Sequence, residues 1–239
     1  MRALNGRWRD LLAAALLIPV AAPMAAADEV PATVVWFQEQ ETGIDPYPVR
    51  YIVTADYLRS DDGVDAGSFL LFDRHTRRIS SVVPANRSVL VIDGEGELPE
   101  KPTSLEFSVR RRVDEKAPAI DGVTPLELKL VAGDKVCRTA LVVPGFLEPV
   151  RAAMQEFSRA LAVQQQRTLS HTPENMQTPC FLSRYLYAGD FQVAQGMPLA
   201  DWDDSGERRE LTRFDTEVGV DDSLFEVPTD YNVITAGGR

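Results

Sequence analysis

Apolar residues recur every three or four positions in one long segment of the chain, residues 146–161. Its apolar positions are Phe146, Leu147, Val150, Met154, Phe157 and Leu161, with charged and amide residues between them. This spacing places the apolar side chains on one face of a helix. We expect an amphipathic helix over about residues 147–166, with Pro149 in its first turn, where the missing N–H costs little.

Most of the remaining chain is patterned as short strands separated by turn residues. Residues 30–40, 49–59, 68–72, 79–83, 88–92 and 105–113 are expected strands, rich in β-branched and aromatic residues. Residues 126–131 and 136–143 flank Gly133-Asp134, which indicates a hairpin. Further strands are expected at residues 180–188, at 191–194 and within 208–220, with a frayed tail from residue 234.

This order of elements predicts an α+β fold that is mostly β. We expect a curved antiparallel sheet, an unclosed β-barrel or half-barrel, packed around one long amphipathic helix. The sequence contains no repeat of fixed period and no linker that divides it. A single β-rich domain is therefore expected over residues 28–239.

The N-terminal 27 residues have the pattern of a secretory signal peptide. Arg2, Arg7 and Arg9 precede an apolar stretch at residues 11–22, and Ala25-Ala26-Ala27 offers a cleavage site before Asp28. The apolar stretch is short for a membrane span, and an uncleaved anchor is the alternative. We expect an exported bacterial protein of the periplasm that is not stably inserted in the membrane after cleavage.

The net charge of the chain argues against polyanionic partners. Without residues 1–27 the chain keeps 22 of its 25 basic and 35 of its 36 acidic residues, a formal net charge of −13. Such a protein repels nucleic acid and anionic membrane surfaces, so neither is an expected non-specific partner. The acidic residues are spread along the chain, which favours a role in solubility.

The chain has two cysteines, Cys137 and Cys180, one on each side of the expected helix. In an exported protein this number indicates a disulfide. A pair of buried free thiols is the alternative. A bond would join two expected strands and hold the helix against the sheet.

No motif has the spacing of a catalytic or metal site. Residues 201–206 (DWDDSG) begin like a calcium loop, but Thr212 stands where the closing carboxylate is needed. We interpret them as an acidic hairpin tip, and Asp61-Asp62 as a solvated turn. His75 and His171 belong to no recognisable motif. We therefore expect no enzymatic activity, no metal and no cofactor.

Residues 110–112 (RRR) form the main basic cluster of the sequence. On a strand, successive side chains point to opposite faces, so the three arginines cannot form one flat patch. A contact for an acidic partner or a lipid headgroup is one interpretation. We favour a charged strand edge that discourages pairing with other sheets.

Four segments together resemble a known family. They are residues 55–62 (ADYLRSDD), 67–73 (GSFLLFD), 78–83 (RISSVV) and 222–231 (DSLFEVPTDY), the last containing Leu-Phe-x-x-Pro-x-x-Tyr. Their order resembles the periplasmic lipoprotein carriers of the LolA/LolB superfamily and allied exported bacterial proteins. The resemblance implies an unclosed barrel around helical segments, with an apolar cavity that holds acyl chains. This chain differs in having one clear helix, flanked by cysteines.

Three functions are compared on this basis. The first is a non-enzymatic binding or carrier protein that holds a hydrophobic lipid or acyl ligand between sheet and helix. Its expected contacts are Val150, Met154, Phe157 and Leu161, and the alternative is that this helix face packs a dry core. The second is an envelope regulatory or accessory module that binds another protein. The third, a hydrolase, lacks an identifiable nucleophile, base or metal cluster.

Overall fold

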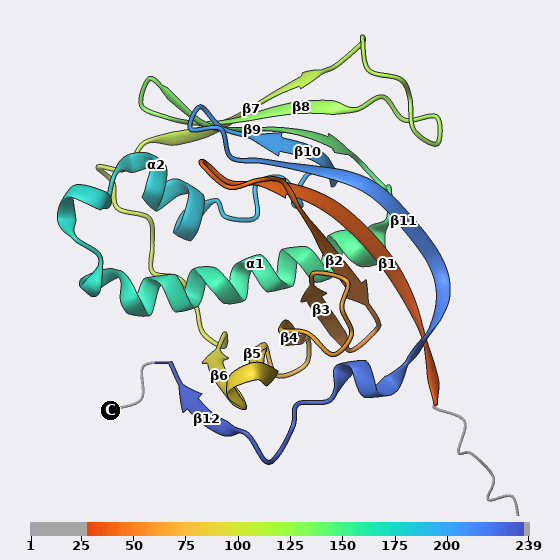
Figure 1. Ribbon diagram of the computed structural model, residues 1–239. Coiled ribbons are helices and arrows are strands. Elements are labelled where there is room, and N and C mark those ends of the chain that lie inside the picture. Colours follow the sequence, from red (N-terminus) through yellow and green to blue (C-terminus); the bar gives the residue numbers. More distant parts are fainter. Residues whose placement is uncertain (1–27, 237–239) are drawn as a thin grey trace, which may run out of the picture.

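A single curved sheet wraps around a long helix, α1 (Glu148–Thr168), in the computed structural model, which describes residues 28–236 (Figure 1). The sheet has twelve strands in the order β12-β6-β5-β4-β3-β2-β1-β11-β10-β9-β8-β7. The strands are β1 (Glu29–Gln40), β2 (Tyr47–Val53), β3 (Tyr57–Asp61), β4 (Phe69–Asp73), β5 (Arg78–Val83), β6 (Ser88–Asp93), β7 (Phe107–Val113), β8 (Leu126–Ala132), β9 (Lys135–Val143), β10 (Met197–Trp202), β11 (Arg208–Asp221) and β12 (Asn232–Thr235). The predicted signal peptide lies outside the described residues.

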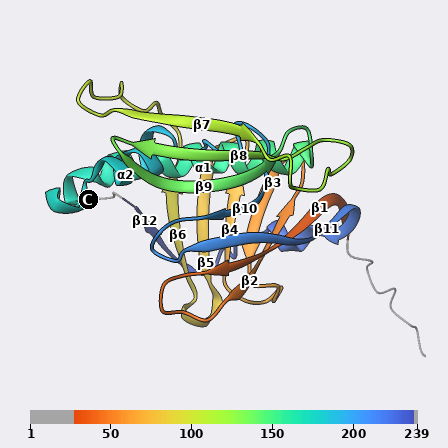
Figure 2. The same ribbon diagram turned by 90° about the horizontal axis from the view of Figure 1, so that it is seen from above.

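The predicted fold class is confirmed. The sheet does not close, and it twists so strongly that β7–β9 run across β3–β6 (Figure 2). All neighbouring strands pair antiparallel except β12, which is parallel to β6. The expected fraying from residue 234 is therefore wrong for Ile234 and Thr235, which pair with Leu90 and Val91.

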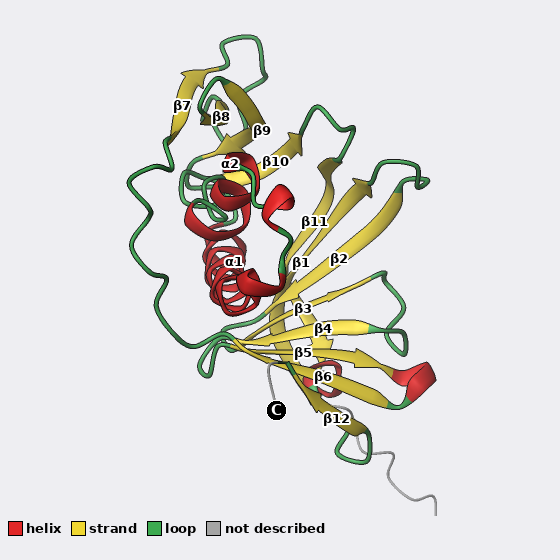
Figure 3. Ribbon diagram, turned by 90° about the vertical axis from the view of Figure 1, so that its left-hand side faces the viewer, coloured by secondary structure: helices red, strands yellow, loops and turns green. Residues whose placement is uncertain are grey.

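Strands β1–β6 contribute side chains to two cores, one on each face of the sheet, since successive side chains of a strand point to opposite sides. Along β1, Val35 and Phe37 belong to the core on the concave side, whereas Ala32 and Val34 belong to a second core on the convex side. Figure 3 shows α1 nearly along its axis, on one side of these strands. The convex core is covered instead by the C-terminal segment, residues 222–235.

Helix α1 matches its predicted range and packs its apolar face on the concave side of the sheet. The chain enters the helix through Leu147, whose φ of 44° lies in the left-handed region, and Pro149 is in the first turn as expected. Val150 is fully buried, and the ring of Phe157 lies 5.6 Å from that of Phe72. At Gly94 a Cβ would lie 2.5 Å from the Cβ of Ala160, so the helix passes too close for any larger residue.

The segment after α1 departs from prediction. Residues 180–188 were expected to form a strand, but they lie in a short helix, α2 (Pro179–Leu182), and a π-helical turn (Ser183–Tyr187). The expected strand at residues 191–194 is a turn. Thr178 accepts a hydrogen bond from the amide of Phe181 and Pro179 follows it, so a cap and a first-turn proline mark this helix.

The expected disulfide is present. Cys137 on β9 and Cys180 on α2 are bonded, with their Cα atoms 5.2 Å apart. The expectation that both cysteines lie on strands is wrong for Cys180. The bond fixes the segment after α1 to the β8–β9 hairpin, where Phe191 and Ala188 join the buried side chains of Leu128 and Ala140. No helix within residues 28–236 is long and apolar enough to span a membrane.

Candidate ligand-binding pocket

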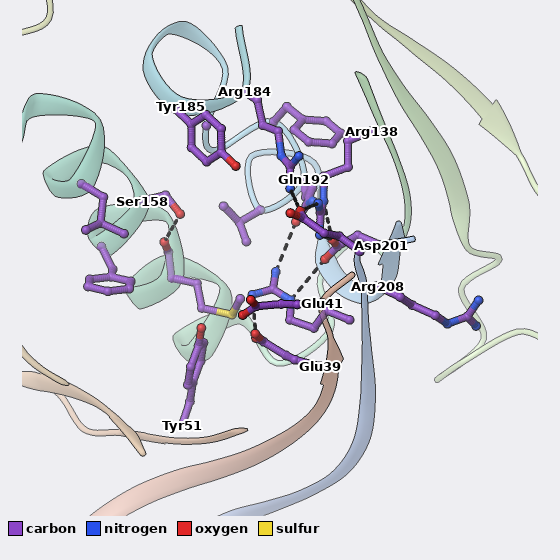
Figure 4. Close-up of a pocket in the computed structure, with 18 of the residues that line it drawn as sticks. Glu39, Glu41, Tyr51, Arg138, Ser158, Arg184, Tyr185, Gln192, Asp201 and Arg208 are labelled. Atoms are coloured by element: carbon purple, nitrogen blue, oxygen red, sulfur yellow. Dashed lines mark hydrogen bonds and ion pairs between the residues drawn. The ribbon is translucent and has the colours of Figure 1, made fainter. Parts of the chain in front are cut away.

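A pocket of about 370 Å³ opens between α1, the concave face of the sheet and the segment that follows α2. Its volume is near the lower end of the range for small-molecule sites, roughly 300–1,000 Å³. Figure 4 shows the side chains that surround it. The lining residues are Glu39, Gln40, Glu41, Tyr51, Arg138, Met154, Phe157, Ser158, Leu161, Arg184, Tyr185, Gly189, Phe191, Gln192, Val193, Asp201, Glu207, Arg208 and Arg209.

Three of the four side chains predicted to contact a ligand lie together at this pocket. Met154, Phe157 and Leu161 supply its apolar side from α1. Met154 and Phe157 are buried, whereas 40% of Leu161 is exposed. Val150 does not line the pocket, because it is fully buried between α1 and the sheet. The helix face therefore fills a core at its N-terminal part and borders a cavity further along.

The opposite wall is built from an ionic cluster around Asp201 of β10. The Asp201 side chain is 1% exposed and bridges Arg138 of β9 and Arg209 of β11, whose Nε lies 3.1 Å from its Oδ2. The Arg209 guanidinium also stands 4.9 Å over the ring of Phe37. Burial lowers the pKa of Arg209, but the charges of Asp201 and its neighbours outweigh burial and raise this pKa overall. Arg209 therefore keeps its positive charge.

Glu39 stands at the end of β1 beside this cluster. One of its carboxylate oxygens lies 3.9 Å from Nη1 of Arg209, too far for a hydrogen bond. Burial raises the pKa of Glu39 above its ordinary value, and Arg209 partly opposes this shift. Burial also raises the pKa of Tyr51, which keeps this phenol protonated. The carboxylate therefore faces the pocket with hydrogen-bonding capacity to spare.

The third wall, residues 183–193, is held in place by contacts with three elements. The disulfide ties its start to β9, and Arg184 pairs with Asp203 at 2.9 Å and with Glu207 on the β10–β11 hairpin. Asp190 accepts hydrogen bonds from Arg159 and Gln155 of α1, at 3.1 and 3.0 Å. The position of this wall thus depends on long-range contacts.

A second pocket, of about 390 Å³, lies beside the same segment and shares Ser158 and Gly189 with the first. Its wall includes Arg77, Arg159 and the glycine-containing loop at residues 94–98. Arg159 is already paired with Asp190. The two pockets flank the contact between α1 and the segment after α2.

The sequence patterns did not predict the charged residues of the first pocket. The strand pattern of β1 contained a signal for one of them, because Glu39 follows Val35 and Phe37 at intervals of two, on the same face. Asp201 was interpreted as part of an acidic hairpin tip, which is wrong because it lies inside β10 and is buried. The hairpin tip expected there is formed by residues 203–206, where Asp203 accepts a hydrogen bond from the amide of Ser205.

A second buried ionic group lies on the convex face and contradicts the expected solvated turn. The Asp61 side chain is fully buried and pairs with Arg50 at 2.8 Å and Arg59 at 2.7 Å. Arg59 also donates to the carbonyl of Leu224, and Tyr57 stacks on Phe225 at 5.5 Å. Two of the segments that carry the family resemblance, around residues 59 and 224, therefore meet in space.

The remaining candidates lie at the surface. Residues 110–112 are exposed on β7, the outermost strand, as expected of a charged edge. His75 is 73% exposed and lies 2.6 Å from Asp56. Within residues 28–236, no group of three or more His, Cys, Asp or Glu side chains is arranged to hold a metal ion.

No protein-family model and no curated protein sequence matches the chain. Among solved structures, an uncharacterized conserved protein from Thermus thermophilus is similar over 86% of this chain and 90% of that chain, at 10% identity and a TM-score of 0.44. PNGF-II is similar over 86% of this chain and 31% of that chain, at 11% identity and a TM-score of 0.39. Similarity this low assigns neither a fold family nor an activity.

Proposed function

We propose that the protein is a non-enzymatic binding protein of the bacterial periplasm that holds an amphipathic small molecule between α1 and the concave face of the sheet. The observation that carries this proposal is the pocket itself, which has an apolar side on α1 and an ionic wall opposite. The predicted signal peptide and the resemblance to lipoprotein carriers favour the same role.

The apolar side accounts for affinity. Leu161 is 40% exposed at the pocket, although it belongs to the apolar face of α1. Covering exposed apolar surface is favourable by roughly 25 cal/mol per Å². A ligand chain lying along Leu161, Met154 and Phe157 would cover this surface, and its binding would be stabilised accordingly.

The ionic wall favours an amphipathic ligand over a purely hydrophobic one. A purely apolar molecule filling the pocket would strip water from the carboxylates and guanidinium groups of the wall without replacing their hydrogen bonds, which is costly. A ligand with a polar end beside Glu39 and Arg209 avoids that cost. In this proposal the acyl chain lies along α1.

The pocket offers no histidine- or cysteine-based catalytic group and no activated serine among the described residues that line it. The hydroxyl of Ser158 donates to the carbonyl of Met154 in its own helix. A serine nucleophile needs an adjacent base, which Ser158 does not have here. Binding without chemistry is the function that this set of side chains supports.

Native mass spectrometry of protein purified from bacterial periplasm, followed by lipid extraction, tests the proposal directly. We expect a bound amphiphile of small-molecule mass at up to one per chain. Protein that is consistently free of such a molecule would contradict the proposal. Recovery of a stoichiometric protein partner instead would favour the alternative of an envelope regulatory or accessory module.

A pair of substitutions then locates the ligand. Leu161→Gln replaces the apolar surface at the pocket with a polar amide, so affinity for the extracted ligand should fall about tenfold, or about 1.4 kcal/mol. Val233→Gln is the matched control, because Val233 is 58% exposed on β12, outside the pocket lining. Equal affinity of the two variants, by isothermal titration calorimetry, would show that the ligand binds elsewhere.

A further inference from the structure

The charges that line the pocket are balanced. Four of its lining residues are acidic (Glu39, Glu41, Asp201 and Glu207) and four are arginines (Arg138, Arg184, Arg208 and Arg209). Each arginine already has a carboxylate partner within the structure. An anionic ligand would lose its hydration on entering and find no arginine without a carboxylate partner. This pairing works against anionic ligands.

Arg209 and Glu39, which lie next to each other in the wall, can each form a further hydrogen bond. Arg209 donates through Nε to Asp201 at 3.1 Å and through Nη2 to the Gln192 side chain at 3.4 Å. Its Nη1 faces Glu39 across 3.9 Å, beyond hydrogen-bond distance. A donor and an acceptor thus stand side by side at the pocket without forming a hydrogen bond to each other.

A hydroxyl or an amide that sits beside both atoms suits this pair, because each can accept one hydrogen bond and donate another. Accepting from Nη1 of Arg209 and donating to the carboxylate of Glu39 would satisfy both partners at once. A carboxylate ligand could only accept, and it would lie against the like charge of Glu39. An ammonium ligand could only donate, and it would lie against the guanidinium of Arg209.

We infer that the pocket selects amphiphiles with an uncharged head group bearing a hydroxyl or an amide, bound by Glu39 and Arg209, with the apolar tail along Leu161. The inference rests on the proposed binding function and adds to it the class of head group. Glu39 and Arg209 are then the residues that determine specificity, and α1 supplies affinity for the tail.

Four probes with the same twelve-carbon chain test the inference: monolauroylglycerol, N-lauroylglycinamide, laurate and dodecylammonium. Isothermal titration calorimetry at neutral pH, below micelle-forming concentrations, measures each affinity. We expect at least one uncharged probe to bind about tenfold more tightly than either charged probe. Comparison of the two uncharged probes distinguishes a hydroxyl from an amide as the preferred head group.

The Glu39→Gln variant tests the assigned residue. It removes one negative charge from the lining and supplies an amide donor, so the affinity for laurate relative to monolauroylglycerol should rise about tenfold. Glu115→Gln is the control, because it changes the net charge equally at an exposed position outside the pocket lining. The control should leave the ratio unchanged, and thermal melting verifies that both variants are folded.

The outcomes separate the two proposals. If none of the four probes binds, the proposed binding function is overturned together with the inference. If a charged probe binds as tightly as the uncharged ones, the inference is overturned while the binding function stands. If Glu39→Gln leaves the affinity ratio unchanged, Glu39 does not bind the head group, and the assignment is wrong.

Discussion

Each face of the curved sheet carries an aspartate that bridges two arginines, and the two groups differ in what lies beside them. On the convex face, Asp61 pairs with Arg50 and Arg59, and the group is sealed by the C-terminal segment through the carbonyl of Leu224. The side chains of Arg59 and Asp61 are 2% and 0% exposed. This group holds two parts of the chain together and has no room for a ligand.

On the concave face, Asp201 pairs with Arg138 and Arg209 in the same arrangement, but the group borders a pocket instead of a covering segment. Glu39 stands beside it without closing the gap to Arg209. The same residue types therefore form a structural clamp where the surroundings close over them, and a polar wall of a pocket where they do not. Their covering makes the difference.

The largest expected effect is on the convex group. Asp61→Asn leaves the buried Arg59 without its counter-charge, which should lower the free energy of unfolding by about 3–5 kcal/mol. Urea denaturation measures the change. Asp62→Asn is the control, because Asp62 is exposed in the adjoining turn, and it should cost less than about 1 kcal/mol. Similar losses in both variants would show that the buried pairing is not what stabilises this face.

The disulfide is next in magnitude and acts on the concave side. Reducing Cys137–Cys180 opens a loop spanning 43 residues. In the chain-entropy account this costs about 4 kcal/mol. We expect a clearly lower melting temperature in reducing agent, together with weaker ligand binding, because residues 183–193 form one wall of the pocket. An unchanged melting curve would contradict this role.

Asp201→Asn should lower the free energy of unfolding by about 1–3 kcal/mol. This loss is smaller than the one expected for Asp61→Asn. Arg138 keeps a second carboxylate, Glu207, at 3.3 Å, and the pocket admits water to the remaining charges. The substitution also leaves the pocket with one more positive than negative charge, so laurate should bind more tightly than to the unaltered protein. Calorimetry and urea denaturation together test this, and a loss as large as that of Asp61→Asn would remove the distinction between the two faces.

The smallest expected effect is the pH dependence contributed by Glu39. Burial raises the pKa of Glu39 in the folded protein above the ordinary value of 4.5, so the folded state binds this proton more tightly than the unfolded chain. Stability from this residue is therefore present at low pH and falls as pH rises from 4.5 through the raised pKa. Glu39→Gln should abolish that fall when unfolding is measured across this interval.

Asp61 should behave in the opposite way. Burial raises the pKa of Asp61, but hydrogen bonds from Arg50, Arg59 and the Gly63 amide outweigh burial and lower this pKa below its ordinary value of 3.8. Its contribution to stability is present above pH 3.8 and is lost as pH falls through the lowered pKa. If the free energy of unfolding changes equally with pH in Glu39→Gln and in the unaltered protein, the opposite behaviour expected of Glu39 and Asp61 is contradicted.

Local patterns sufficed for α1 and for most strands between Glu29 and Val143. The single strand expected at residues 49–59 was wrong, because the chain turns between β2 and β3. The disulfide followed from the number of cysteines and the expected export. The 3.6-residue period of α1 and the alternation of the strands depend on neighbours close in the sequence, and their burial is set by the same residues that show the pattern. The strand predicted at residues 180–188 was wrong. The aromatic residues of this segment favoured a strand, whereas the helix cap formed by Thr178 and the first-turn Pro179 was overlooked.

The burial of particular polar side chains, in contrast, depends on contacts between distant parts of the chain. Asp61 and Asp201 both stand in acidic segments that have the pattern of exposed turns. Asp61 nevertheless reaches its clamp through Arg59, which bonds to Leu224 across 165 positions, and Asp201 reaches Arg138 across 63. Such contacts leave no periodic trace in the chain, because each depends on how the sheet curls and on what covers it. A curved sheet around one helix is thus encoded in local patterns, whereas the packing of the folded chain makes one ionic group seal a face and leaves the other open to a pocket.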